Sequence, residues 1–215
     1  KNATKRAARD CGLEVKITKE PTAAATDYLH RYTEFDKNGV AVLVYDFGGG
    51  TFDVSVVQRQ MDSFKEIATG GDNTLGGNLL TDRVVTYLIG RIEEQYACEF
   101  PAEEDADELD GDAYTAYQKN MAAVRRTANQ MKEALSDESE MEKDIPLTIN
   151  GEEKIFGAYI SRDDFEEMIR PDIDRTVAIV QHTLDKAMEK GIERIDTVVL
   201  VGGSSKVPLA RTALQ

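Results

Sequence analysis

The chain has 215 residues, 41% of them apolar, which is enough to bury the core of one large domain or of two small ones. Its 26 Lys and Arg residues against 40 Asp and Glu residues give a formal net charge of −14, which argues against a protein that binds nucleic-acid backbones or an anionic membrane surface. No apolar run approaches the roughly 18 residues that span a bilayer, and the basic opening Lys1 to Arg9 lacks the apolar stretch of a signal peptide. We therefore expect a cytoplasmic protein with no membrane and no nucleic-acid partner.

The two cysteines, Cys11 and Cys98, are far apart and form no CxxC pair, so a reducing compartment is expected. The chain opens on Lys1 and stops at Gln215 within a helical pattern. We expect it to be a piece of a longer protein.

Short β-rich runs alternate with long helical patterns, which predicts a mixed α/β architecture. Residues 1 to 12 predict the end of a helix that closes at Gly12, followed by a short strand from Leu13 to Thr18. Pro21 predicts a helix start, because proline suits the first helical turn. The polar stretch Thr33 to Gly39 predicts a loop at a boundary.

A sheet is predicted next. The apolar run Val40 to Phe47 predicts a strand covered on both faces. The glycines Gly48 to Gly50 predict a turn into a second strand, Thr51 to Gln60, with Ser55 on its polar face. Residues 64 to 69 predict a third strand.

Two helices and a hairpin are predicted after the sheet. Leu80, Val84, Leu88 and Ile92 recur at helical spacing, and a second helix is predicted over residues 113 to 136. Between them, residues 93 to 112 hold ten acidic residues and no basic one, which predicts a solvated helix end and loop. Asn150-Gly151 between alternating flanks predicts a hairpin over residues 145 to 159.

The last part of the chain predicts a long helix, a strand and a further helix. Ser161 and Asp164 resemble a helix start, and the apolar spacing continues to Met188 with a possible bend at Pro171. Thr197 to Val201 predicts a strand, which a glycine turn connects to a helix begun by Val207-Pro208.

The segment from Asp46 to Asp53 carries the strongest chemical signal. Consecutive glycines after a buried strand let the backbone approach a bulky anion, and their amides can form a nest for phosphate oxygens. Asp46 and Asp53 would repel a bare phosphate, so a cation or its water shell is expected between them. An ordinary glycine-rich hairpin with polar residues on its wet face fits the spacing equally well.

Gly202-Gly203-Ser204-Ser205 forms a second glycine turn, which leads from a strand directly to a helix start. Helix N-termini attract anions through unpaired amides and the helix dipole. A tight connection without a ligand is at least as consistent with this pattern.

Four motifs together resemble the heat-shock-70 chaperones (DnaK-like). They occur in family order over essentially the whole chain. They are Glu20-Pro21-Thr22-Ala23-Ala24-Ala25, Asp46-Phe47-Gly48-Gly49-Gly50-Thr51-Phe52-Asp53-Val54-Ser55, Gly71-Asp72-Asn73-Thr74-Leu75-Gly76-Gly77 and Val199-Leu200-Val201-Gly202-Gly203-Ser204-Ser205-Lys206-Val207-Pro208. Actin-like cytoskeletal proteins share the Glu-Pro and triple-glycine elements, but the Thr-Phe-Asp continuation and the Ser-Ser-Lys-Val-Pro ending resemble the chaperones.

The resemblance implies an α/β fold of the actin-like ATPase (ribonuclease H-like) type, of which this chain is the second lobe. That lobe is expected to have a mixed sheet with flanking helices and a smaller outer α+β subdomain. Residues 1–37 are then the end of the first lobe, with its last strand and connecting helix. Residues 38–75 and 160–215 form the base subdomain, and residues 76–159 form the outer one.

The resemblance also implies ATP or ADP with Mg²⁺, and K⁺ as a further candidate ion. Gly48, Gly49 and Gly50 match the turn that wraps the β- and γ-phosphates, and Thr51 matches the residue that faces the γ-phosphate. Asp46 and Asp53 match carboxylates that hold ions and water, and Glu20 matches one that contacts magnesium through water. The expected catalytic residues are Glu20, Asp46, Thr51 and Asp53, and the expected metal contacts of the three carboxylates are mostly through water.

The other expected nucleotide-binding residues come from three later segments. They are Gly76, Gly77, Asn129, Lys132, Ser136, Gly202, Gly203, Ser204, Lys206 and Val207. The family pattern is not followed everywhere: Asn129 replaces a Glu that usually contacts the ribose, Glu133 stands where some members carry a base-stacking Arg, and Asn78 replaces a usual Glu. These departures put adenine affinity in doubt and suggest a specialised member of the family.

Two function classes stay open. The first is a fragment of the ATP-binding domain of a heat-shock-70-like chaperone, which contributes the phosphate and adenosine half of the nucleotide site and is inactive alone. The parent protein would be a stress-response ATPase that works with a J-domain co-chaperone and a nucleotide-exchange factor and binds unfolded peptide through a domain absent here. The alternative is a nucleotide-free actin-like interaction module or another actin-like ATPase. Apolar positions in residues 1 to 37, such as Leu13 and Val15, predict self-association of the fragment.

Overall fold

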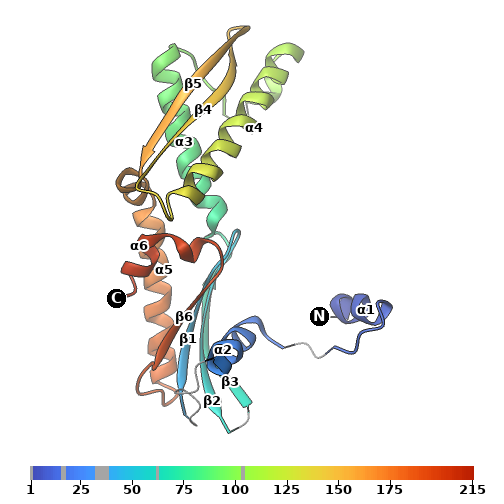
Figure 1. Ribbon diagram of the computed structural model, residues 1–215, viewed down its shortest axis with the longest axis vertical. Coiled ribbons are helices and arrows are strands. Elements are labelled where there is room, and N and C mark those ends of the chain that lie inside the picture. Colours follow the sequence, from blue (N-terminus) through green and yellow to red (C-terminus); the bar gives the residue numbers. More distant parts are fainter. Residues whose placement is uncertain (1, 16–17, 32–38, 62, 103–104) are drawn as a thin grey trace. The chain divides into compact units, whose positions relative to one another are not determined.

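The computed structural model describes residues 2–15, 18–31, 39–61, 63–102 and 105–215, and Figure 1 labels its helices and strands. The chain divides into two compact units, which we call the sheet unit and the helical unit. The sheet unit comprises Lys1–Asp46, Asp53–Gly71 and Ile179–Val201. The helical unit comprises Phe47–Phe52, Asp72–Ala178 and Gly202–Gln215. The domain boundaries expected from the sequence stay a prediction.

A four-stranded sheet forms the centre of the sheet unit. Its strands follow the order β3-β2-β1-β6, with bounds β1 Ala41–Phe47, β2 Phe52–Gln60, β3 Ser63–Asp72 and β6 Thr197–Val201. β1 and β6 are parallel, in a register that pairs Val42 with Thr197 and Asp46 with Val201. The four-residue connection from β1 to β2 is too short for a parallel crossover, so these two strands run antiparallel. The expected mixed sheet is confirmed.

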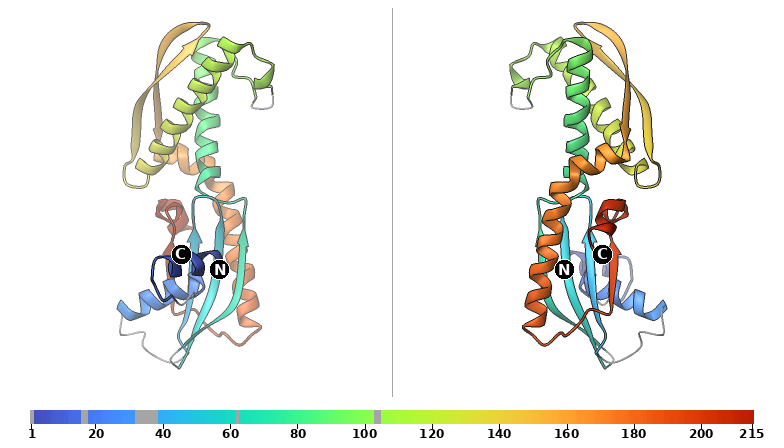
Figure 2. Two further views of the ribbon diagram at one scale, coloured as in Figure 1. Left: turned by 90° about the vertical axis from the view of Figure 1, so that its right-hand side faces the viewer. Right: turned by 90° about the vertical axis from the view of Figure 1, so that its left-hand side faces the viewer.

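Helices cover both faces of this sheet, as Figure 2 shows for α2 (Glu20–Arg31) and α5 (Arg162–Met188). On the α2 face, Ala25 packs in one buried cluster with Val42, Val44 and Val57. On the other face the approach of α5 is close, because a Cβ added to Gly70 would lie 2.3 Å from the Thr183 hydroxyl oxygen. Burial on both faces explains the continuous apolar sequence of β1.

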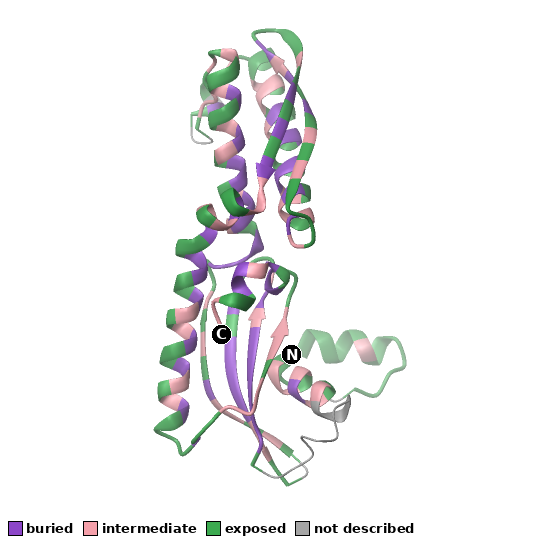
Figure 3. Ribbon diagram, turned by 60° about the vertical axis from the view of Figure 1, so that its left-hand side comes forward, coloured by how far each residue is buried: buried purple, intermediate pink, exposed green. Residues whose placement is uncertain are grey.

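The burial of β2 shows that one prediction, the polar face of this strand, is wrong at Ser55. Ser55, expected on a polar face, is only 4% exposed. Figure 3 shows that β1 and β2 are buried over most of their length. Because helices cover both sides of the sheet, β2 has no solvent-exposed face at this point, and polar and apolar residues need not alternate there.

The first residues of the chain depart from the prediction. α1 (Asn2–Asp10) ends before Gly12, whose φ of +74° fits the expected helix closure. Leu13 to Val15 and Thr18 belong to no strand, so the predicted strand is wrong for these residues, and residues 16 and 17 lie outside the described part. A strand needs a neighbouring strand for its backbone hydrogen bonds, and the described sheet offers none to this segment. The predicted polar loop lies outside the described residues except for Gly39.

Two helices and a two-stranded sheet build most of the helical unit. α3 (Gly77–Tyr96) packs against α4 (Gly111–Ala134), and α4 packs against β4 (Glu140–Ile149). β4 pairs antiparallel with β5 (Glu152–Ser161), as the sequence predicted. Asn150 and Gly151 both have positive φ, +52° and +79°, which is the backbone of a tight type I′ turn. The acidic stretch covers the end of α3, the short 3₁₀ helix η2 (Ala106–Glu108) and the start of α4.

The remaining elements confirm the predicted helix starts. At the start of α5, the Asp164 backbone N–H donates to the Ser161 hydroxyl at 3.1 Å. The final strand leads through η3 (Ser204–Lys206) into α6 (Pro208–Thr212), which has its proline in the first turn. None of the helices in the described ranges is long and apolar enough to cross a membrane.

Candidate functional site

Two buried aromatic residues flank the triple-glycine turn in the chain. Phe47 and Phe52 flank the turn, are both fully buried, and meet edge to face with ring centroids 5.8 Å apart. Within the turn, the Gly48 N–H donates to the Thr51 carbonyl at 3.0 Å. Gly49, Gly50 and Thr51 are exposed. The rings therefore fix the base of the turn while its glycine tip faces solvent.

The start of α3 lies directly against this turn. The Gly77 N–H donates to the Gly48 carbonyl at 2.9 Å, and the Asn78 N–H donates to the Gly49 carbonyl at 2.7 Å. A Cβ on Gly76 would lie 2.5 Å from the Gly50 carbonyl carbon, so only glycine fits there without a shift. Two of the amides that a helix N-terminus leaves unpaired are thus satisfied by the turn itself.

The second glycine turn also packs against the first. The Ser204 hydroxyl donates to the Gly48 carbonyl at 2.9 Å. Gly202 has φ +87°, and a Cβ there would lie 2.3 Å from the Phe47 carbonyl oxygen. Positive φ and close backbone contact both require glycine at this position. The two motifs that the sequence separates by about 150 residues are therefore neighbours in the helical unit.

A cavity of about 560 Å³ opens where these segments meet α4. Nine of the residues predicted to bind nucleotide line it: Gly49, Gly77, Asn129, Lys132, Ser136, Gly203, Ser204, Lys206 and Val207. The other predicted glycines of these motifs do not line it. Four further lining residues, Asn78, Leu80, Glu133 and Asp137, were not predicted as binding residues.

Lys132 is held within the cavity wall by three acceptors of the chain. Its ammonium donates to the Asn129 amide oxygen at 2.9 Å, to the Thr81 hydroxyl at 3.0 Å and to the Gly77 carbonyl at 3.1 Å. All three acceptors are neutral. Burial lowers the pKa of Lys132, an effect that the nearby Glu133 carboxylate partly opposes. Lys132 thereby joins α4 to the first turn of α3.

Asn129 links this lysine to an acid on the next helical turn. Its amide nitrogen donates to Glu133 at 2.8 Å, while its oxygen accepts from Lys132. Thr81, which is 4% exposed and completes the network, was not predicted from the sequence. A polar residue beside the apolar positions Leu80 and Val84 was the available signal, because a buried hydroxyl needs a partner.

The three predicted carboxylates, Glu20, Asp46 and Asp53, belong to the sheet unit. Burial raises the pKa of Asp46, and the negative charges of Glu20 and Asp53 raise it further. In the described part of the chain, no group of three or more His, Cys, Asp or Glu side chains could hold a metal ion directly. A cation with its water shell would relieve the repulsion at Asp46, so the three carboxylates fit the chemistry of the expected Mg²⁺.

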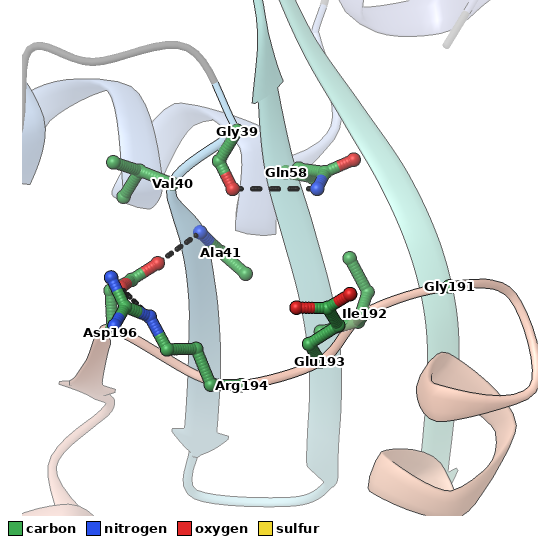
Figure 4. A pocket seen from close by; sticks show the side chains of 9 residues that line it. All are labelled: Gly39, Val40, Ala41, Gln58, Gly191, Ile192, Glu193, Arg194 and Asp196. Carbon is green, nitrogen blue, oxygen red and sulfur yellow. Dashed lines mark hydrogen bonds and ion pairs between the residues drawn. The ribbon is translucent and has the colours of Figure 1, made fainter.

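A separate hollow of about 410 Å³ lies in the sheet unit and is lined by none of the predicted residues (Figure 4). Several of its polar groups bond to one another. Asp196 accepts from the Ala41 N–H at 2.9 Å and pairs with Arg194 at 2.9 Å, and the Gln58 amide donates to the Gly39 carbonyl at 3.4 Å. These contacts tie the connection before β6 to the start of β1.

The sheet and the paired glycine turns are those expected of an actin-like ATPase fold, and comparison with known proteins agrees. A family model described as Hsp70 protein matches residues 1–215. The chain therefore belongs to the Hsp70 family, which confirms the resemblance inferred from the four motifs.

Two curated relatives show how much of the family architecture is covered. The chain is 34% identical over 219 residues to the "Chaperone protein DnaK" of Mycoplasma mobile, an alignment that covers 100% of this chain and 33% of the relative. It is 35% identical over 213 residues to the "Chaperone protein DnaK" of Mycoplasmopsis synoviae, with 97% and 32% covered. The chain spans about a third of the length of these relatives.

Proposed function

We propose that this chain forms the phosphate and adenosine half of the ATP site of an Hsp70-like molecular chaperone. The observation that supports it most is the single cavity that collects nine predicted residues from four segments, spread between Gly49 and Val207. The two glycine turns are also in contact, because the Ser204 hydroxyl of one donates to the Gly48 carbonyl of the other. An ordinary glycine-rich hairpin, the competing interpretation of the sequence, gives no reason for this convergence.

The chain's own groups suit the two ends of a nucleotide. The exposed Gly49 and Gly50 offer backbone amides without a blocking Cβ, which suits phosphate oxygens. Asn129, Ser136 and Lys206 offer polar groups around the cavity, which suit a sugar and a base. Bound Mg²⁺ would supply positive charge against the phosphates, with Glu20, Asp46 and Asp53 holding it through water.

We further propose that the chain alone binds nucleotide weakly and does not turn it over. A half-site leaves one side of the ligand in water, and a Kd of about 1 mM corresponds to only about −4 kcal/mol. ATP turnover, clamping of unfolded peptide, and cooperation with a J-domain co-chaperone and a nucleotide-exchange factor belong to the longer protein in this proposal. There, Thr51→Ala or Asp46→Ala should abolish ATP turnover.

Isothermal titration calorimetry of the chain with Mg-ATP and Mg-ADP tests the proposal. Ser136→Phe should abolish the millimolar binding, because the ring fills the cavity, whereas Ser139→Phe, at an exposed position nearby that does not line the cavity, should leave it unchanged. Micromolar binding would contradict the half-site. Absence of binding at about 10 mM nucleotide would favour the nucleotide-free interaction module instead.

A further inference from the structure

A second cavity of the helical unit, of about 310 Å³, lies apart from all the predicted nucleotide residues. We call it the hairpin pocket. The loop after α3 contributes Phe100, the loop after η2 contributes Leu109, the first half of α4 contributes Ala113 and Ala116, and the end of β4 contributes Ile149. Its volume is at the lower end of the roughly 300–1,000 Å³ found for ligand pockets.

Hydrogen bonds hold the walls of the hairpin pocket in place. The Asn120 side chain bonds both backbone groups of Thr148 at 2.8 Å, which ties the hairpin to α4. The Glu93 carboxylate accepts from the Phe100 N–H at 2.7 Å, which fixes the loop after α3. The Asp110 carboxylate caps the first turn of α4 at 2.9 Å. A pocket with walls fixed in this way is formed before any ligand arrives, so binding costs little ordering.

The surroundings of the pocket are strongly negative. Residues 98–101 and Leu109 line the pocket, and in the sequence they belong to the stretch 93 to 112, which holds ten acidic residues and no basic one. The hairpin turn is followed by Glu152, which pairs with Lys154, and by Glu153, for which no ion pair within the described residues is found. The lining itself contains Glu99 but neither Lys nor Arg. This field repels phosphates, so neither a nucleotide nor an anionic membrane surface fits the site.

We propose that the hairpin pocket is a docking site for a basic segment of a partner protein. One apolar side chain of that segment, the size of Leu or Phe, enters the pocket, and flanking Lys or Arg residues face the acidic stretch. Apolar burial supplies affinity, and charge complementarity selects the partner and speeds encounter. The docking site is separate from the nucleotide-binding function proposed above and does not depend on it.

Fluorescence polarisation with a labelled peptide, Lys-Arg-Leu-Phe-Lys-Arg, tests the proposal on the whole chain. Binding should weaken with added salt. It should fall at least tenfold when Leu and Phe of the peptide become Ser, and at least tenfold when its basic residues become Glu. Equal binding of the acidic peptide, or no binding at about 1 mM chain, would overturn the proposal.

Matched variants on α4 locate the binding. Ala116→Phe fills the pocket and should weaken peptide binding at least tenfold, whereas Ala122→Phe, at an exposed position of the same helix that does not line the pocket, should leave it unchanged. Thermal melting checks that both variants fold, and Ala113→Tyr replaces Ala116→Phe if that variant does not. Unchanged binding by a folded pocket-filling variant would overturn the assignment. So would self-association of the chain that the pocket-filling variant abolishes, because the occupant would then be a second copy.

Discussion

Replacing Gly202 by Ala is the sharpest perturbation of the contact between the two glycine turns. Gly202 has φ +87°, in the region that L side chains rarely adopt. The new methyl group would lie 2.3 Å from the Phe47 carbonyl oxygen, 2.5 Å from the carbonyl carbon and 2.9 Å from the Gly48 nitrogen. All three atoms are backbone, so no flexible side chain can move aside. Gly203→Ala is the matched control, because Gly203 has ordinary helical angles, φ −65° and ψ −38°, and nothing lies within 4 Å of the added methyl group.

The magnitude follows from two costs. Left-handed backbone costs a non-glycine residue about 1–2 kcal/mol, and overpacking of a well-packed site costs about 1–3 kcal/mol. Gly202→Ala should therefore lower the free energy of unfolding by about 3 kcal/mol. Gly203→Ala should raise it by about 0.5 kcal/mol, because alanine restricts the unfolded chain.

Urea unfolding followed by circular dichroism measures both variants by linear extrapolation. The urea midpoint should drop clearly for Gly202→Ala and should not drop for Gly203→Ala. Equal midpoints for the two variants would refute it, because the steric and conformational arguments apply only to Gly202.

Three further substitutions probe charged groups. Asp172→Ala should destabilise the chain by about 2–3 kcal/mol in urea titration, because the Asp172 side chain is 2% exposed and accepts two hydrogen bonds from a half-exposed Arg83; a loss below about 0.5 kcal/mol would contradict this. Asp46→Asn should raise the melting temperature at pH 7 but not near pH 3. Because the pKa of Asp46 is raised in the folded chain, its ionised carboxylate lowers the stability of the fold as the pH rises from about 3.8 through that folded-state pKa. An equal gain in melting temperature at pH 3 and at pH 7 would contradict this. Asn129→Glu should raise the pKa of Lys132, because it replaces a neutral acceptor with a carboxylate; an unchanged lysine titration by NMR after ¹³C-methylation would show that Asn129 does not set this pKa.

The sequence predicted the described sheet and helices well, because their patterns are local. The apolar run of β1 and the Asn150-Gly151 turn each specify a structure without reference to distant residues. The strand predicted from Leu13 to Thr18 is wrong for its described residues. A strand needs a neighbouring strand to which it can form hydrogen bonds, and alternating apolar residues do not show whether such a neighbour exists. Ser55 was misplaced for the related reason that burial of a second face depends on a helix far along the chain.

The candidate site could be predicted only in part from the sequence. The glycines were predicted because their residue type and spacing can be read from the sequence. The structure shows why two of these positions require glycine: Gly202 has positive φ, and Gly76 lies against the backbone of the turn. The hydrogen-bond network around Lys132 could not be found in this way. It joins α3 to α4, and pairing of side chains between two helices depends on how the helices pack.

Chemical-shift mapping of the ¹⁵N-labelled chain during titration with Mg-ATP tests the central claim most directly. The account predicts millimolar, saturable shifts that cluster at the lining residues of the 560 Å³ cavity, among them Gly49, Gly77 and Gly203. It also predicts no comparable shifts at Phe100 or Ile149 in the hairpin pocket. Shifts absent from the cavity, or scattered over the acidic stretch, would contradict the assignment of a nucleotide half-site.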